Sequence, residues 1–120
     1  MKKILIVEDV EMNRDLLVQL LEDDYQLVEA VDGKQGLEMV SSEMPDLVLL
    51  DISLPEMDGW EVTRRIRADE STRHVPIVAV TAHAMAGDEE RAYETGCRGY
   101  LAKPIDEDRL WRLVKELIGS

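Results

Sequence analysis

Short apolar runs alternate with amphipathic stretches along the chain, and this alternation constrains the fold more than any other feature of the sequence. The apolar runs are nearly continuous, which is typical of strands that are buried on both faces of a parallel sheet. Strict alternation of strand and helix favours an α/β fold with helices on both faces of the sheet. The five predicted strands run from Lys3 to Glu8, Gln26 to Val31, Asp46 to Asp51, Ile77 to Ala82 and Gly99 to Lys103.

Five amphipathic stretches predict five helices, and the last of them has the clearest helical periodicity. Its apolar residues recur at every third or fourth position and are Leu110, Leu113, Val114, Leu117 and Ile118. The first helix is expected to bury a similar stripe, formed by Met12, Leu16, Leu17, Leu20 and Leu21.

Acidic residues mark two of the helix starts. Asp32 is followed three positions later by Gln35, and Asp58 by Glu61, which is the spacing of a capping box. The stretch between Ala84 and Thr95 predicts the weakest helix, because Gly87 interrupts it, and we expect it to be the most mobile.

Length and charge limit the classes of function. A chain of 120 residues predicts a single domain that spans residues 1–120. The net charge of −12 argues against binding to nucleic acid or to anionic membranes, and basic protein surfaces are the better partners. The sequence has no apolar run of about 20 residues and no signal peptide, so we expect a cytoplasmic protein. The single cysteine, Cys97, fits a small buried packing residue without a redox role.

Polar residues stand at the ends of four of the apolar strands. Right-handed crossovers place the carboxyl ends of parallel strands at one edge of the sheet, so these side chains are expected to converge. Crowded carboxylates oppose one another's ionisation unless a cation lies among them. Mg²⁺ fits best, with Mn²⁺ as a substitute, because oxygen ligands suit it and softer metals would require Cys or His. The residues concerned are Glu8, Asp9, Asp51, Thr81 and Lys103.

Asp51 is the candidate nucleophile of this group. A carboxylate can accept a phosphoryl group and form an acyl phosphate. The charge of the transferred group could be neutralised by a divalent cation on Glu8 and Asp9, by the ammonium of Lys103 and by the hydroxyl of Thr81.

Four motifs occur in an order and spacing that resemble a response-regulator receiver domain, of the stand-alone or hybrid-kinase type. They are residues 6–9 (IVED), 51–59 (DISLPEMDG), 80–82 (VTA) and 100–104 (YLAKP). The resemblance covers the whole chain and is closest to chemotaxis-regulator-like domains. It implies a flavodoxin-like, doubly wound sheet with strand order 2-1-3-4-5.

The resemblance also implies roles for individual residues. Asp51 would accept a phosphoryl group from a histidine kinase or a histidine phosphotransfer protein in a two-component system or phosphorelay. Glu8, Asp9, Asp51 and the backbone carbonyl of Ser53 would hold Mg²⁺. The domain would catalyse its own phosphorylation and dephosphorylation without being an enzyme in any other sense.

The resemblance further predicts how the signal leaves the site. Lys103 would contact the phosphoryl group, and its peptide bond to Pro104 would be cis. Thr81 would move toward the phosphoryl group, and the ring of Tyr100 would rotate inward from a more exposed position. The surface of the fourth helix, fifth strand and fifth helix would then control a downstream protein.

Some positions depart from the commonest receiver pattern. Val10 follows the acid pair where a polar residue is frequent, and it could alter the loop above the metal ligands. Ser53 and His83 flank the path of water to the acyl phosphate, so we expect them to tune its lifetime.

Other functions have weaker support. A flavodoxin-like electron carrier would place the FMN phosphate against Glu8 and Asp9, which would repel it. An aspartate-nucleophile phosphatase would carry a second acid at the position of Ser53, and a P-loop NTPase would need a glycine-rich loop ending in Lys-Ser or Lys-Thr. A stand-alone regulator is favoured, with a receiver excised from a hybrid kinase or larger regulator, or a phosphorylation-independent interaction module, as alternatives.

Overall fold

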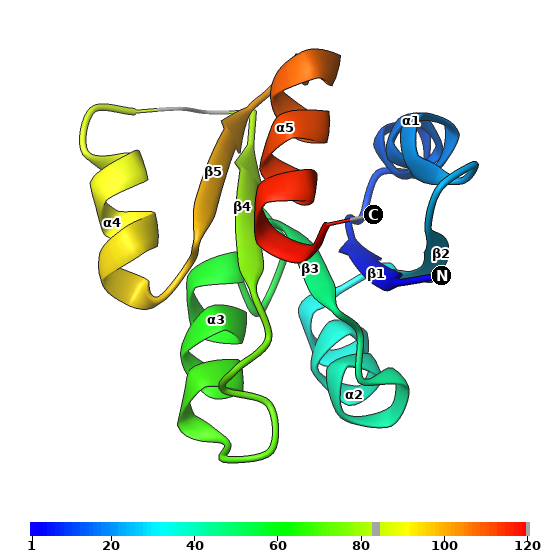
Figure 1. The fold of residues 1–120 in the computed structure, drawn as a ribbon. Coiled ribbons are helices and arrows are strands. Elements are labelled where there is room, and N and C mark those ends of the chain that lie inside the picture. Colours follow the sequence, from blue (N-terminus) through cyan, green and yellow to red (C-terminus); the bar gives the residue numbers. More distant parts are fainter. Residues whose placement is uncertain (83–84, 120) are drawn as a thin grey trace.

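The computed structural model describes residues 1–82 and 85–119. Five strands and five helices alternate within these residues, as predicted (Figure 1). The strands are β1 (Lys3–Val7), β2 (Gln26–Ala30), β3 (Leu47–Asp51), β4 (Ile77–Thr81) and β5 (Gly99–Ala102). The helices are α1 (Glu11–Leu21), α2 (Gly33–Glu43), α3 (Gly59–Ala68), α4 (Asp88–Thr95) and α5 (Glu107–Ile118).

The strands form one parallel sheet in the order β2-β1-β3-β4-β5, which confirms the flavodoxin-like prediction. The strand order reverses beside β1, because the chain first winds to β2 and then crosses back to β3. Figure 1 shows α1 and α5 on one face of the sheet and α2 and α3 on the other. Ligands of such sheets bind at the carboxyl ends of the strands near this reversal.

Alternate residues of the strands face the two halves of the core. In β3, Val48 and Leu50 pack in the cluster that includes side chains of α2, α3 and α4. Leu47 and Leu49 pack in the cluster that includes side chains of α1 and α5. Because both faces are covered, β3 is buried throughout, and this explains its continuous apolar sequence.

The two predicted helix caps are confirmed. The Asp32 carboxylate accepts a hydrogen bond from the Gln35 amide at 2.7 Å, and the Asp58 carboxylate accepts one from the Glu61 amide at 3.0 Å. The Gln35 side chain also accepts from the Val31 amide at 2.7 Å, which closes the start of α2.

Several predicted boundaries and packing assignments are wrong. Four strands end one residue earlier than expected, and β3 begins at Leu47 instead of Asp46. Met12 and Leu16 are 80% and 45% exposed, because the buried face of α1 is centred on Leu17 and Leu21. Gly87 precedes α4 instead of interrupting it, with a φ of 91° that favours glycine.

Ala84, where this helix was expected to begin, lies outside the described residues, and the mobility of the helix stays a prediction. Cys97 is buried, as expected for a packing residue. Among residues 1–82 and 85–119, no helix has the length and apolarity needed to cross a membrane.

Candidate functional site

Three carboxylates meet at the carboxyl edge of the sheet. Glu8 and Asp9 directly follow β1, and Asp51 is the last residue of β3. The two strands are neighbours with Val7 opposite Leu50, so the next residue of each chain segment falls at the same level. Oxygen atoms of the three carboxylates lie within 4.8 Å of one another. The predicted convergence of these acids is therefore present.

Two of these carboxylates are almost completely buried. Glu8 is 2% exposed and Asp51 is 5% exposed, whereas Asp9 lies at the exposed side of the cluster. Partial desolvation raises the pKa of the Asp9 carboxyl above its ordinary value, and the adjacent Glu8 carboxyl adds to the rise. The cluster thus has the electrostatics of a cation site that is open on one side.

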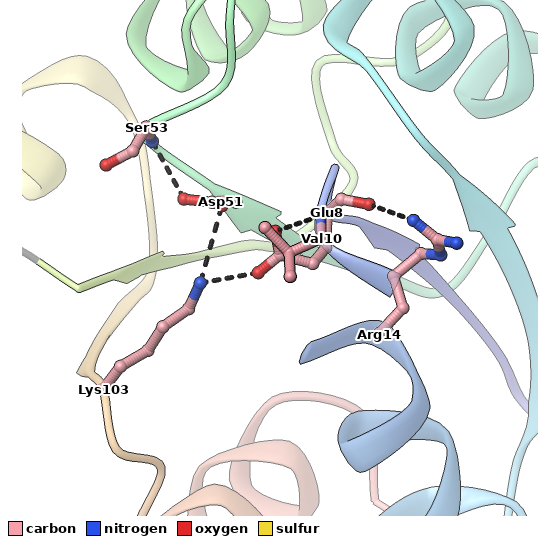
Figure 2. Close-up of polar contacts among 6 residues, drawn as sticks. All are labelled: Glu8, Val10, Arg14, Asp51, Ser53 and Lys103. Carbon is pink, nitrogen blue, oxygen red and sulfur yellow. Dashed lines mark hydrogen bonds and ion pairs between the residues drawn. The ribbon is translucent and has the colours of Figure 1, made fainter. Parts of the chain in front are cut away.

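Lys103 supplies a positive charge inside the site. Its ammonium lies 2.5 Å from Oε1 of Glu8 and 3.5 Å from Oδ2 of Asp51. Figure 2 shows both contacts as dashed lines. The side chain of Lys103 is only 17% exposed, and its peptide bond to Pro104 is cis. One ammonium therefore faces three carboxylates, and the site keeps an excess of negative charge.

Backbone amides orient the two buried acids. Oδ1 of Asp51 accepts a hydrogen bond from the Ser53 amide at 2.9 Å, and Oε2 of Glu8 accepts one from the Val10 amide at 3.1 Å (Figure 2). Each buried carboxylate is thus held by an amide two residues further along its own loop. Val10 contributes its backbone amide to this arrangement, and the side-chain pattern of the sequence did not indicate this contact.

Thr81 and Tyr100 lie on the strands beyond Asp51. Thr81 ends β4, which pairs with β3, and Thr81 is 3% exposed. Its backbone carbonyl accepts a hydrogen bond from the Lys103 amide at 2.8 Å, so β4 and the end of β5 are joined at the site. His83, the other residue expected near the phosphoryl path, lies outside the described residues.

The Tyr100 ring is in a buried position. Tyr100 is 7% exposed, and its hydroxyl has no hydrogen-bond partner among the described residues. Burial raises the pKa of the Tyr100 phenol, and the nearby carboxylates of Asp88 and Glu89 at the start of α4 add to this effect. The ring therefore connects β5 with α4, which lies at the outer edge of the sheet.

Sequence reasoning missed one cation next to the acid pair. Arg14 of α1 donates a hydrogen bond from Nη1 to the backbone carbonyl of Glu8 at 2.9 Å. The only available signal was a basic residue five positions after Asp9 in a helix that was expected to begin beside the site.

Comparison with known proteins shows a consistent set of similarities. The sequence model described as "Response regulator receiver domain" matches residues 4–115. The polar-differentiation response regulator DivK of Brucella abortus is 43% identical over 120 residues, which cover 99% of this chain and 98% of that protein. DivK of Brucella anthropi is 42% identical over the same share of both chains.

Solved structures show the same similarity. The receiver domain of a sensor histidine kinase from Pseudomonas aeruginosa, which has a magnesium ion coordinated in its active-site cleft, superposes with a TM-score of 0.89. It is 38% identical and covers 99% of this chain, with 98% of its own length matched. A putative response regulator from Chloroflexus aurantiacus has a TM-score of 0.92 at 28% identity, with the same coverage.

Proposed function

The chain belongs to the response-regulator receiver domain family of two-component signalling, and from this premise we propose that Asp51 is its phosphoryl acceptor. A single observation carries the proposal: Asp51 is a buried carboxylate that shares its site with two further acids and one lysine. A buried acid cluster of this kind is unfavourable for stability alone, and it suits a site that binds cations and anions in turn.

The residues present fit Mg²⁺. Glu8, Asp9 and Asp51 offer hard oxygen donors, and Asp9 leaves one side of the cluster open to water. Three carboxylates against the one ammonium of Lys103 leave two negative charges, which match a divalent cation. We propose that these three residues hold Mg²⁺ together with the Ser53 carbonyl. When bound, Mg²⁺ would neutralise charge on the phosphoryl oxygens.

The transfer step follows from the position of Asp51. One oxygen of its carboxylate would form a bond to the phosphorus of a phosphohistidine, and the bond from phosphorus to the imidazole nitrogen would break. The imidazole would leave with that electron pair and take a proton. Lys103, already 3.5 Å from Oδ2 of Asp51, would then pair with the new phosphoryl oxygens.

Hydrolysis would reset the domain. Water would attack the acyl phosphate and regenerate the Asp51 carboxylate with release of phosphate. Ser53 is exposed beside the acceptor, and we propose that its side chain and that of His83 set the rate of this step. Because only the chain's own residue is modified, the domain acts as a switch instead of as an enzyme on a separate substrate.

Thr81 and Tyr100 would carry the change outward. Thr81 joins the site to β5 through its carbonyl, and Tyr100 lies in β5 beneath α4. We propose that the α4, β5 and α5 surface presents the phosphorylated state to a downstream protein. The ring of Tyr100 is already buried in the structure, so its rotation from a more exposed position stays a prediction.

An apolar groove gives a phosphodonor protein a place to dock. The groove has a volume of about 350 Å³, and its lining includes Glu8 and Lys103 of the site. Its apolar lining includes Leu16 of α1 and Ile105, and the exposed Met12 lies on the same helix. A donor bound here, either a histidine kinase or a phosphotransfer protein, would present its histidine close to Asp51.

A direct test uses acetyl phosphate as a small phosphodonor. The protein is incubated with acetyl phosphate and Mg²⁺, and its intact mass is compared with that of Asp51→Asn and of Asp23→Asn, a surface control. We expect one phosphoryl adduct in the wild type and the control, and none in Asp51→Asn. An equal adduct in Asp51→Asn would overturn the proposal, as would a wild type that is modified neither by acetyl phosphate nor by a phosphohistidine donor.

A further inference from the structure

Arg14 is a mostly buried cation that contacts none of the three carboxylates in the ion pairs of the described residues. Its side chain is 14% exposed. Nη1 donates to the Glu8 carbonyl at 2.9 Å, and Nε lies 3.5 Å from a carboxylate oxygen of Glu29 in β2. Figure 2 shows the guanidinium beside the backbone of Glu8, on the opposite side from Lys103. Arg14 thus joins α1 to the ends of β1 and β2.

The backbone of Glu8 is held from both sides. Its amide donates to the Ala30 carbonyl of β2 at 3.1 Å, and its carbonyl accepts from Arg14. The Glu8 carbonyl and the Asp9 amide belong to one planar peptide unit, so fixing that carbonyl also fixes the direction in which Asp9 leaves the strand. Asp9 is the carboxylate of the cluster that has the least protein around it.

We infer that Arg14 is a positioning residue for the proposed cation site. It orients the peptide between Glu8 and Asp9 so that both carboxylates converge on Asp51, and Glu29 holds the guanidinium in place. This inference rests on the proposed function, since it concerns how the chain prepares the ligands for Mg²⁺.

The charge of Arg14 and its positioning role predict opposite changes in Mg²⁺ affinity when Arg14 is replaced. A positive charge near a cation site repels the cation, so loss of the charge alone would tighten Mg²⁺ binding. Loss of a group that orients metal ligands through hydrogen bonds weakens binding, commonly by about tenfold or more. The sign of the change therefore separates positioning from simple electrostatics.

The experiment measures Mg²⁺ affinity by titration calorimetry for wild type, Arg14→Met and Arg14→Lys, at a temperature where circular dichroism shows each protein folded. Arg64→Met is the matched control, because it removes an arginine from an exposed ion pair with Glu61 on α3. We expect affinity to fall by about tenfold in Arg14→Met, to fall less in Arg14→Lys, and to stay unchanged in Arg64→Met.

Equal or tighter Mg²⁺ binding by Arg14→Met would overturn the inference. Should Arg14→Met fail to fold, Arg14→Lys decides, because it keeps the charge and loses the planar fork that reaches two partners. Unchanged affinity in Arg14→Lys would then refute positioning. Failure of the proposed function would give a different result. The wild type itself would not bind Mg²⁺, or Asp51→Asn would bind Mg²⁺ as tightly as the wild type does. Either result would also refute the inference about Arg14.

Discussion

Replacing Lys103 with methionine tests the charge balance of the site. The ammonium lies 2.5 Å from Oε1 of Glu8 and 3.5 Å from Oδ2 of Asp51, and both acids are at least nine-tenths buried. Methionine keeps a long flexible side chain but leaves these acids without their cation. We expect Lys103→Met to destabilise the protein strongly when no divalent cation is present.

The burial of the ion pair sets how much stability Lys103→Met loses. Removing one partner of a buried ion pair costs about 3–5 kcal/mol, and the partial exposure of Lys103 favours the lower end, about 3 kcal/mol. The unfolding entropy is about 2.1 cal/mol/K per residue, or about 0.25 kcal/mol/K for this chain. Lys103→Met should therefore lower Tm by about 12 °C.

Mg²⁺ should reverse much of this loss. A cation at ten times its Kd adds about 1.4 kcal/mol of stability, or about 6 °C in Tm. In Lys103→Met no ammonium competes for Glu8, so the variant should bind Mg²⁺ more tightly than wild type does. The rise in Tm caused by Mg²⁺ should consequently be larger in the variant.

Thermal unfolding followed by circular dichroism, in EDTA and in a series of Mg²⁺ concentrations, measures both effects. Lys34→Met serves as the control, because it removes a lysine that is exposed on α2. Two results would refute the reasoning: a Tm of Lys103→Met in EDTA equal to that of wild type, or a Mg²⁺-induced rise no larger than in wild type.

Two further predictions concern packing. A Cβ added at Gly59 would lie 2.7 Å from the backbone oxygen of Asp51 and 2.7 Å from Cα of Ile52, so it would clash with the backbone. A Cβ added at Gly87 would meet nothing within 4 Å, and the only cost there is the strain of the positive φ. Gly59→Ala should cost about 2 kcal/mol and Gly87→Ala about 1 kcal/mol in urea unfolding, and the reverse order would contradict the steric argument. Burial raises the pKa of the Cys97 thiol, so its reaction with a disulfide reagent should be slow at pH 8. The reaction rate should keep rising with pH beyond the pH at which the rate of an exposed thiol becomes constant. Equal labelling rates with and without urea would show that the thiol is accessible.

The strand pattern was sufficient to predict a parallel sheet covered by helices on both faces, because burial on both faces leaves a strong local signal. Strands such as β3 have no polar interior residue. The strand order came from the resemblance to receiver domains, and the structure confirms it. Strand ends were predicted less well. Glu8 and Lys103 follow their strands directly and are largely buried, so the sequence does not mark where hydrogen bonding between the strands stops.

Helical periodicity alone did not identify the buried part of α1. The predicted stripe from Met12 to Leu21 is wide, and periodicity does not indicate which part of it faces the sheet. Met12 lies about 180° from Leu21 around the helix axis, and it is 80% exposed, whereas Leu17 and Leu21 are buried. Such exposed apolar residues next to a functional edge are better candidates for partner contact than for core.

The predicted acid cluster followed from topology, but its internal pairing did not. Glu8 and Lys103 are 95 residues apart, and no spacing rule connects them. The contact between Arg14 and the Glu8 carbonyl was equally hidden, because a backbone acceptor carries no sequence signature. Arg67 has the same property: among the described residues its guanidinium donates to backbone carbonyls, including those of Val75 and Gly96, and burial lowers its pKa.

The single ammonium of Lys103 links the steps of the proposed cycle. Lys103 pairs with Glu8 and Asp51 in the form described here, and it is also the group expected to pair with phosphoryl oxygens. If Lys103 shifts toward a phosphoryl group, it releases Glu8 for the divalent cation, and a cation on Glu8 releases Lys103 in turn. Each event then favours the other, and linkage requires the two couplings to be equal in free energy. Phosphorylated protein should therefore bind Mg²⁺ more tightly than the unmodified form, by a factor that is reduced when Lys103 is replaced.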